Sequence, residues 1–189
     1  MANSNNPNGF TPAYHLTGGT IRMNEMRIAD DYATSIFAGD LVSQAADGTI
    51  AVAGEGDQPI GVFAGCSYTK DSGEVVFSSH WAASTSVNGS YATANVYSDP
   101  NIAYRAQFEG ASGIADIGQL ADMETTHAGS TLNGRSGQEI SSTTGTVTAT
   151  LRILDFVDSP DNDSESDNAE AYVQIVEHKL SEAPVATGV

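Results

Sequence analysis

A run near the middle of this chain, in which apolar and other side chains alternate, sets the strongest limit on its fold. The apolar members are Ile102, Tyr104, Ala106 and Phe108, and the residues between them are Ala103, Arg105 and Gln107. Successive side chains of a β-strand point to opposite faces of the sheet. The alternation therefore predicts a strand that buries one face and leaves the other in water.

Shorter runs of the same kind recur and are separated by turn signals. Asp47-Gly48 lies between Leu41-Val42 and Ile50, and an Asp-Gly pair there predicts a hairpin because glycine accepts the positive φ of a type I′ turn. Further turn signals are Lys70–Gly73, Asn88-Gly89 and Asp99-Pro100, and further strands are expected at 60–63, 74–77, 91–97, 147–153 and 171–175. The pattern predicts a mainly β fold, sandwich or barrel-like (β-tulip-like).

The chain reads as one β-rich domain over residues 20–180, preceded by an extended arm at 1–19 and followed by a loose tail at 181–189. A division into two β subdomains near residue 111 is the alternative. The stripe of Ile114, Ile117, Leu120 and Ala121 predicts one short amphipathic helix over 114–123. The Thr-, Ser- and Gly-rich residues 124–146 predict a long exposed loop.

The charge balance excludes several classes of partner. Seven basic residues face 24 acidic ones, which gives a formal charge of −17. Because nucleic-acid affinity depends on Lys and Arg, neither DNA nor RNA is expected as a partner. No membrane partner is expected either, since the charge opposes an anionic surface and no apolar run is long enough to span a bilayer. The first residues lack the basic and apolar parts of a signal peptide, so secretory export is not expected.

The composition also favours assembly. Apolar residues make up 40% of the chain but aromatic residues only 7%. A core this poor in large side chains often gains burial from oligomer contacts, so a homo-oligomer or a protein docked on a lattice is expected.

The N-terminal arm contains isolated large side chains in a polar setting. No period of two or 3.6 residues is sustained there, so local structure is not expected. The arm is either a floppy terminus or a segment that becomes ordered on a partner, with its large side chains as plugs. The candidate residues for contacts with a capsid or with another copy are Phe10, Pro12, Tyr14, His15 and Leu16.

Motifs for catalysis or cofactor binding are missing from the sequence. His15, His80, His127 and His178 lie on four separate segments, with no pair at metal-ligand spacing. There is no Gly-x-Ser-x-Gly elbow and no phosphate-binding loop. The single cysteine, Cys66, is expected to be a small core or strand residue. The sequence thus predicts no enzyme, no cofactor and no metal site.

The acidic segment Asp158–Asp167 contains alternating oxygen side chains, as the first half of a calcium loop does. Ser166 stands where the sharp turn of such a loop needs glycine, and Tyr172 stands where a bidentate Glu is needed. A solvated acidic loop is the preferred interpretation, and a weak calcium site is the alternative.

Several segments resemble the virion structural proteins of tailed phages, and in particular the decoration (cement) proteins of the phage head. They are Met1–Asn5, Gly9-Phe10, Pro12, Gly18–Ile21, Gly39–Val42, Asp47-Gly48, Asp57–Phe63, Tyr68, Gly73–Ser78, Trp81 and Asp158–Asn162. The resemblance covers most of residues 1–110. Residues 111–180 exceed the smallest decoration proteins and would form an added lobe.

The resemblance implies a protein on the outer surface of the capsid, bound to the major capsid protein and stabilising the shell by bridging its subunits. It also implies self-association, often as a homotrimer. One alternative is another virion component, such as a tail- or fibre-associated protein. A second is a glycan-binding module or carbohydrate enzyme, for which Trp81, Tyr91 and Tyr97 are the available aromatic platforms.

Overall fold

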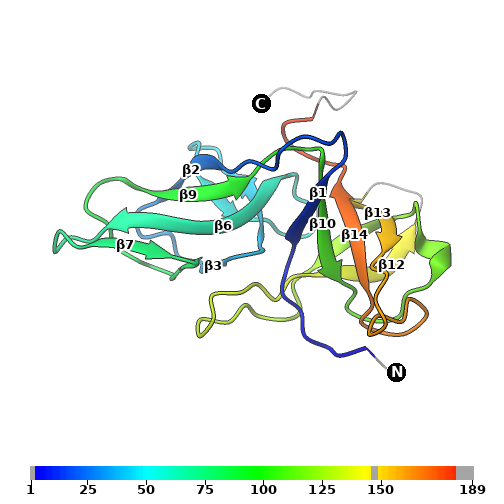
Figure 1. Ribbon diagram of the computed structural model, residues 1–189. Coiled ribbons are helices and arrows are strands. Elements are labelled where there is room, and N and C mark those ends of the chain that lie inside the picture. Colours follow the sequence, from blue (N-terminus) through cyan, green and yellow to red (C-terminus); the bar gives the residue numbers. More distant parts are fainter. Residues whose placement is uncertain (1–2, 146–148, 182–189) are drawn as a thin grey trace.

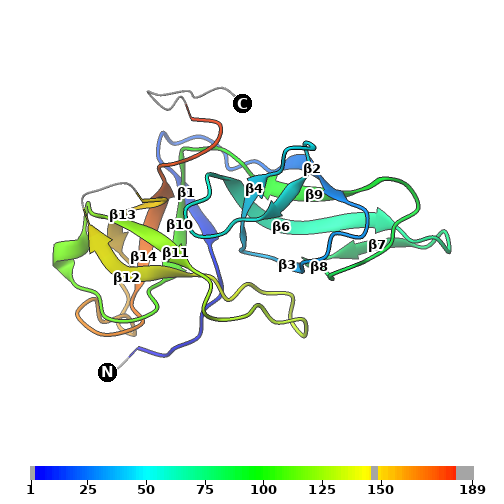
Figure 2. The same cartoon turned by 180° about the vertical axis from the view of Figure 1, so that it is seen from behind.

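The computed structural model describes residues 3–145 and 149–181. Strands account for 44% of the structure and helix for 2%, so the predicted mainly β, sandwich-like fold is confirmed. The strands form two large sheets, which we call sheet A and sheet B. The two sheets occupy opposite ends of an elongated molecule in both views (Figures 1 and 2).

Sheet A is a six-stranded antiparallel sheet built from the two ends of the described chain and its second half. In spatial order its strands are β1 (Thr11–His15), β10 (Ile102–Gln107), β14 (Glu170–Ile175), β13 (Leu151–Phe156), β11 (Leu120–Glu124) and β12 (Glu139–Gly145). Strand β10 is the alternating run, and it lies between β1 and β14. The strands predicted around Leu151–Ile153 and 171–175 are present as β13 and β14.

Sheet B is built from residues 24–97 and is also antiparallel. In spatial order its main path is β2 (Asn24–Ala29), β9 (Tyr91–Tyr97), β6 (Pro59–Thr69), β4 (Leu41–Gln44) and β5 (Ile50–Val52). The first part of β6 pairs with β4 and its last part pairs with β7 (Val75–Ser78). A small two-stranded sheet joins β3 (Ile36–Phe37) to β8 (His80–Trp81).

The hairpin between β4 and β5 lies where the Asp-Gly pair predicts it, with Gln44 opposite Ile50. Its turn is not type I′, because that type needs positive φ at both central residues and only Gly48, at 81°, has it. Instead the Ala45 N–H donates to the Thr49 carbonyl at 2.8 Å, so the loop spans more than two residues. The turn predicted at 70–73 is present between β6 and β7, with Gly73 at a φ of 86°.

Two clusters of buried side chains form the core. One surrounds Tyr104 and Phe108 on sheet A, and it also contains Leu41 and Val62 from sheet B. The other cluster surrounds Trp81 and consists mainly of further buried residues of sheet B. Burying each large apolar side chain contributes roughly 1.5–3 kcal/mol. Because the first cluster draws residues from both sheets, the two ends of the molecule share part of one core.

The helix predicted over 114–123 is wrong beyond its first turn. Only Ile114–Asp116 is helical, as one turn of 3₁₀ helix, and β11 follows it. Within β11, Ala121 and Met123 are buried while Asp122 and Glu124 are only partly covered. This period of two was present in the sequence but competed with a helical stripe of similar strength. Pairing with both β12 and β13 decides in favour of the strand.

Two other expectations are corrected by strand pairing. The arm is not without local structure, because β1 forms on the exposed edge of β10. The loop expected over 124–146 ends at β12, whose partner is β11. The sequence pattern did not predict β12, because Ile140 is the only large apolar residue of this strand. Part of the expected strand at 147–153 and most of the 181–189 tail lie outside the described residues.

The loop at 125–138 leaves sheet A and runs alongside sheet B (Figure 2). The Ala38 N–H donates to the Gly134 carbonyl at 2.9 Å, and the Ser136 N–H donates back to Ala38 at 2.9 Å. In a buried contact, the Leu41 N–H donates to the side-chain Oε1 of Gln138 at 2.7 Å. The loop therefore fastens one sheet to the other.

Candidate interaction surfaces

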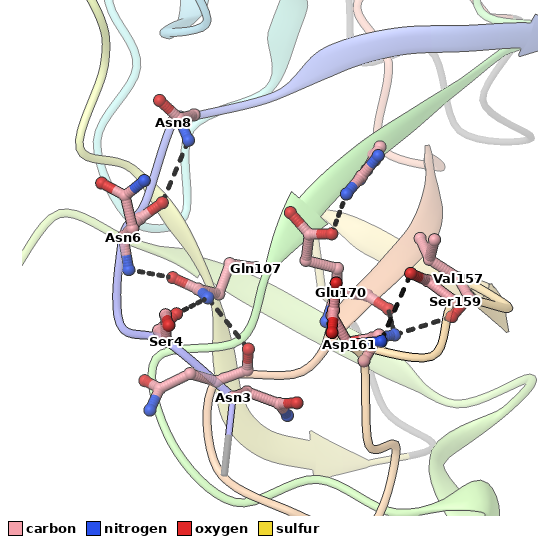
Figure 3. Close-up of polar contacts among 12 residues, drawn as sticks. Asn3, Ser4, Asn6, Asn8, Gln107, Val157, Ser159, Asp161 and Glu170 are labelled. Atoms are coloured by element: carbon pink, nitrogen blue, oxygen red, sulfur yellow. Dashed lines mark hydrogen bonds and ion pairs between the residues drawn. The ribbon is translucent and has the colours of Figure 1, made fainter. Parts of the chain in front are cut away.

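Residues 3–8 of the arm follow an extended path across one end of sheet A without forming a strand (Figure 3). The side chain of Asn3 donates to the carbonyls of Asp163 and Asp167 at 2.9 and 3.0 Å. Its Oδ1 accepts the Asp163 N–H at 2.8 Å. The arm is thus tied to the acidic loop by hydrogen bonds rather than by apolar packing.

Gln107 holds the next part of the arm (Figure 3). Its Oε1 accepts the Asn6 N–H at 3.0 Å, and its Nε2 donates to the carbonyls of Ser4 at 2.7 Å and Asn168 at 2.9 Å. The sequence placed Gln107 on the open face of its strand, yet the side chain is only 7% exposed. The alternation could not reveal this role, because the arm that covers Gln107 comes from a distant part of the chain.

The five candidate contact residues of the arm fall into different environments. Phe10 is 1% exposed and belongs to the core, and its N–H donates to the carbonyl of Gly39, in the turn between β3 and β4, at 2.9 Å. Pro12 is partly buried beside the irregularity in the β1–β10 register. Tyr14 is 42% exposed and Leu16 is 39% exposed. The structure therefore leaves Tyr14 and Leu16 as the open apolar residues of this segment.

His15 is held at the end of β1. Its Nε2 lies 3.2 Å from a carboxylate oxygen of Asp99, and its Nδ1 accepts the N–H groups of Thr17 and Gly19. Hydrogen bonds from the Asn101 N–H, and then from His15, lower the pKa of Asp99. These contacts stabilise the turn that follows β1. The adjoining side chain of Leu16 stays exposed.

A second open apolar region lies on sheet B, on the hairpin that carries β7 (Figure 1). Val75 is 59% exposed and Phe77 is 83% exposed. Tyr91, on β9, is 49% exposed and its ring lies 5.5 Å from the guanidinium carbon of Arg27. The loop at 125–138 adds Leu132, which is 96% exposed. None of these residues was among the contact candidates from the sequence.

A cleft of about 300 Å³ opens where the arm crosses toward sheet B. Its lining includes Phe10 and Pro12 from the arm, Phe63 from β6, and Arg135 from the long loop. The described residues that line it include neither a carboxylate nor a histidine, and its walls are mostly apolar or amide groups. This composition is suited to receiving a side chain rather than to acid–base chemistry.

The four histidines lie in four separate environments. His80 stacks on Phe37, and His178 is buried with its Nδ1 accepting the Leu180 N–H at 3.1 Å. His127 contacts the carboxylate of Glu139, at the start of β12. Among residues 3–145 and 149–181, no group of three His, Cys, Asp or Glu side chains is arranged to hold a metal ion. No described helix is long and apolar enough to cross a membrane.

Cys66 is a buried strand residue, as the sequence predicts. Its thiol lies in the sheet B core and donates to the His80 carbonyl at 3.5 Å. Burial raises the pKa of Cys66 to about 11, so the thiol stays protonated near neutral pH.

The aromatic residues considered for glycan stacking are only partly accessible. Trp81 is fully buried, packs edge-on against Tyr68, and donates its Nε1–H to the Tyr32 carbonyl at 3.2 Å. Tyr97 is partly buried beside the sheet A core. Tyr91 alone of the three presents an exposed ring.

The acidic loop folds on its own backbone (Figure 3). Asn162 donates to the carbonyls of Val157 and Glu170 at 2.8 and 2.9 Å and accepts the Glu170 N–H at 2.7 Å. The carboxylate of Asp163 accepts hydrogen bonds from the Ser166 hydroxyl and the Glu165 N–H, which lower its pKa. The carboxylate oxygens of Asp163 therefore stabilise the turn through hydrogen bonds within it. This is the segment for which a weak calcium site was the alternative prediction.

No protein-family model, no curated protein and no solved structure matches the chain.

Proposed function

We propose that the protein is a capsid decoration protein that binds the outer surface of a tailed-phage head and stabilises the shell by bridging capsid subunits. The partners in this proposal are the major capsid protein and further copies of the chain, arranged as trimers at local symmetry axes. The resemblance of residues 1–110 to decoration proteins motivates the proposal, and three physical features support it.

The feature that carries the proposal is the open edge of sheet A. Strand β1 pairs with β10 on one side, and no other described strand pairs with its outer side. Tyr14 and Leu16 lie exposed on and just after this strand. An edge strand with large apolar side chains suits β-augmentation, in which backbone bonds give affinity and side chains in pockets give specificity.

The charge of −17 supports an outer location. The interior of a filled head is crowded with DNA phosphates, which repel an acidic protein. The outer surface imposes no such cost.

The elongated shape supports bridging. The open apolar residues lie on separate parts of the molecule. Tyr14 is on β1, near the middle, and Phe77 is on β7, toward the far end of sheet B (Figure 1). A body with separated contact points can touch more than one neighbour, and many weak contacts add up on a repeating lattice.

The test is binding to empty, expanded heads built from the major capsid protein of the same virus. The variant Tyr14→Ser/Leu16→Ser should bind at least tenfold more weakly than the unmodified protein, whereas Leu132→Ser should bind as the unmodified protein does. Point variants are preferable to removing residues 1–19, since that deletion also takes Phe10 out of the core. Unchanged binding of the double variant would overturn the assignment of β1 as the capsid contact.

Another virion component, such as a tail- or fibre-associated protein, is the second candidate because the same surfaces serve it equally well. Labelled antibody and electron microscopy of purified particles separate the two by showing label on the head or on the tail. A glycan-binding role is weaker, because the burial of Trp81 leaves Tyr91 as the single well-exposed ring among the three aromatic residues considered. The absence of binding on a glycan array would exclude the glycan-binding role.

A further inference from the structure

Strand β7 is an edge strand with an unusual surface. It pairs with the last part of β6, and no other described strand pairs with it. Val75 and Phe77 point to the same face because they are two residues apart on one strand. They are 59% and 83% exposed, so nothing in the described chain covers them.

The backbone of β7 offers hydrogen bonds at the same two residues. The Lys70 N–H donates to the Glu74 carbonyl at 2.9 Å, which directs the Glu74 carbonyl toward β6. Tyr68 lies opposite Val76 in the register, and backbone groups alternate along an antiparallel strand. The backbone N–H and C=O groups of Val76 therefore point toward β6, whereas those of Val75 and Phe77 point away from β6, to the open edge.

The turn before β7 carries Lys70, Asp71 and Glu74, with Lys70 and Glu74 paired at 2.8 Å, whereas β7 itself is uncharged. Its four residues, Val-Val-Phe-Ser, include no charged side chain. The cross-strand neighbours of Phe77 on the same face of the sheet are, in order, Ser67 on β6, Thr93 on β9 and Arg27 on β2. Natural proteins usually protect an edge strand with charge or proline, and β7 has neither.

We propose that β7 pairs antiparallel with β7 of a second copy of this chain, so that sheet B continues from one copy into the other. The occupant is a second copy because the uncharged edge is complementary to itself: about a two-fold axis, the outward backbone groups and apolar side chains of Val75 and Phe77 meet their counterparts. The contact uses a different strand from the proposed β1 contact with the capsid, so the two can be tested separately, and it is distinct from the trimer contact that the resemblance implies.

One register satisfies both the backbone and the side chains. Placing Val76 on the two-fold axis sets Val75 opposite Phe77 of the second copy, and both residues then exchange their outward backbone hydrogen bonds. The side chains of Val75 and Phe77 meet across the strands on one face. Glu74 falls opposite Ser78, so no two like charges are directly opposed.

The contact is short and so is expected to be weak in dilute solution, below the size of a stable interface. It gains strength where copies are already held side by side on a lattice. Because the rest of both molecules is acidic, added salt should strengthen the association by screening the repulsion.

Sedimentation equilibrium over a range of concentrations tests the interface. The variant Phe77→Lys should lower the association constant at least tenfold, because it places a charge on the joined edge. Leu132→Lys is the matched control: it makes the same charge change at another exposed residue and should leave self-association as in the unmodified protein. Association that persists unchanged in Phe77→Lys would overturn the proposal.

Disulfide trapping tests the register. Cysteines on the two-fold axis form a directly opposed, non-hydrogen-bonded pair whose spacing suits a disulfide. Val76→Cys should therefore give a covalent dimer under mild oxidation, whereas Leu132→Cys should not. The native Cys66 does not interfere, since it is buried. No dimer from Val76→Cys would refute the register. If the protein stays monomeric while Phe77→Lys weakens capsid binding, the occupant of the edge is a capsid strand and not a second copy.

Discussion

His127 and Glu139 close the base of the loop that links the two sheets. The Nδ1 of His127 lies 2.5 Å from a carboxylate oxygen of Glu139, and these residues stand near the two ends of the loop at 125–138. The side chain of Glu139 is fully buried, and its other oxygen has no hydrogen-bond partner among the described residues. A carboxylate is thus buried with half of its hydrogen-bonding capacity unused.

Glu139→Gln should stabilise the protein at neutral pH. Burial, opposed by the contact with His127, raises the pKa of Glu139 above its ordinary value. When the pKa of a carboxyl group is higher in the folded than in the unfolded protein, its protonated form favours folding. The full contribution to stability is present below the unfolded-state pKa and is lost as the pH rises through the folded-state pKa. The neutral variant avoids this loss, so above that pH it should exceed the unmodified protein by about 1 kcal/mol in free energy of unfolding. Below the ordinary carboxyl pKa the two should converge.

Urea unfolding at several pH values measures this difference. Glu55→Gln is the control, because Glu55 is exposed and the substitution removes the same charge. If both variants show the same pH profile, the effect comes from net charge and not from the burial of Glu139.

Gln107→Ala should release the first part of the arm. The substitution removes the acceptor for the Asn6 N–H and the donor to the Ser4 carbonyl. We expect a loss of roughly 1–3 kcal/mol in free energy of unfolding, because partners are left unsatisfied. Hydrogen exchange should become faster at the Asn6 amide. Gln44→Ala, at an exposed strand position, serves as the control and should leave that amide unchanged.

Phe10→Ala should destabilise the whole protein by about 3–5 kcal/mol, since it removes a fully buried aromatic ring and leaves a cavity. Leu132→Ala should change the free energy of unfolding by less than about 0.5 kcal/mol, because Leu132 is exposed. Thermal or urea unfolding decides the matter. Similar small effects in both variants would mean that residues 1–15 are not part of the folded core.

Gly39→Ala should cost more stability than Gly48→Ala. Both glycines have positive φ, at 99° and 81°, so alanine is strained at either position. At Gly39 a Cβ would also stand 2.8 Å from the carbonyl oxygen of Asn8, whereas nothing lies within 4 Å at Gly48. The Gly48 variant isolates the backbone strain of about 1 kcal/mol, and the excess in the Gly39 variant measures the close approach of the arm. Equal losses would show that the arm gives way freely.

Features that depend on neighbouring residues could be predicted from local sequence signals. The period of two in β10 and the glycines at 48 and 73 predict a strand and two hairpins, because side-chain alternation and positive φ are local properties. The acidic charge is likewise a property of composition and needs no fold.

Features that depend on residues far apart in the chain had no local signal and became evident only in the folded protein. Strand β1 and the burial of Phe10 exist because β10 offers an open edge and the turn before β4 offers the Gly39 carbonyl. The partners of Gln107 and Glu139 come from distant or looping segments, so neither burial has a local signal. The physical reason is the same throughout: a strand's pattern shows that one face will be covered, but the covering groups are supplied by segments that meet only when the chain is folded.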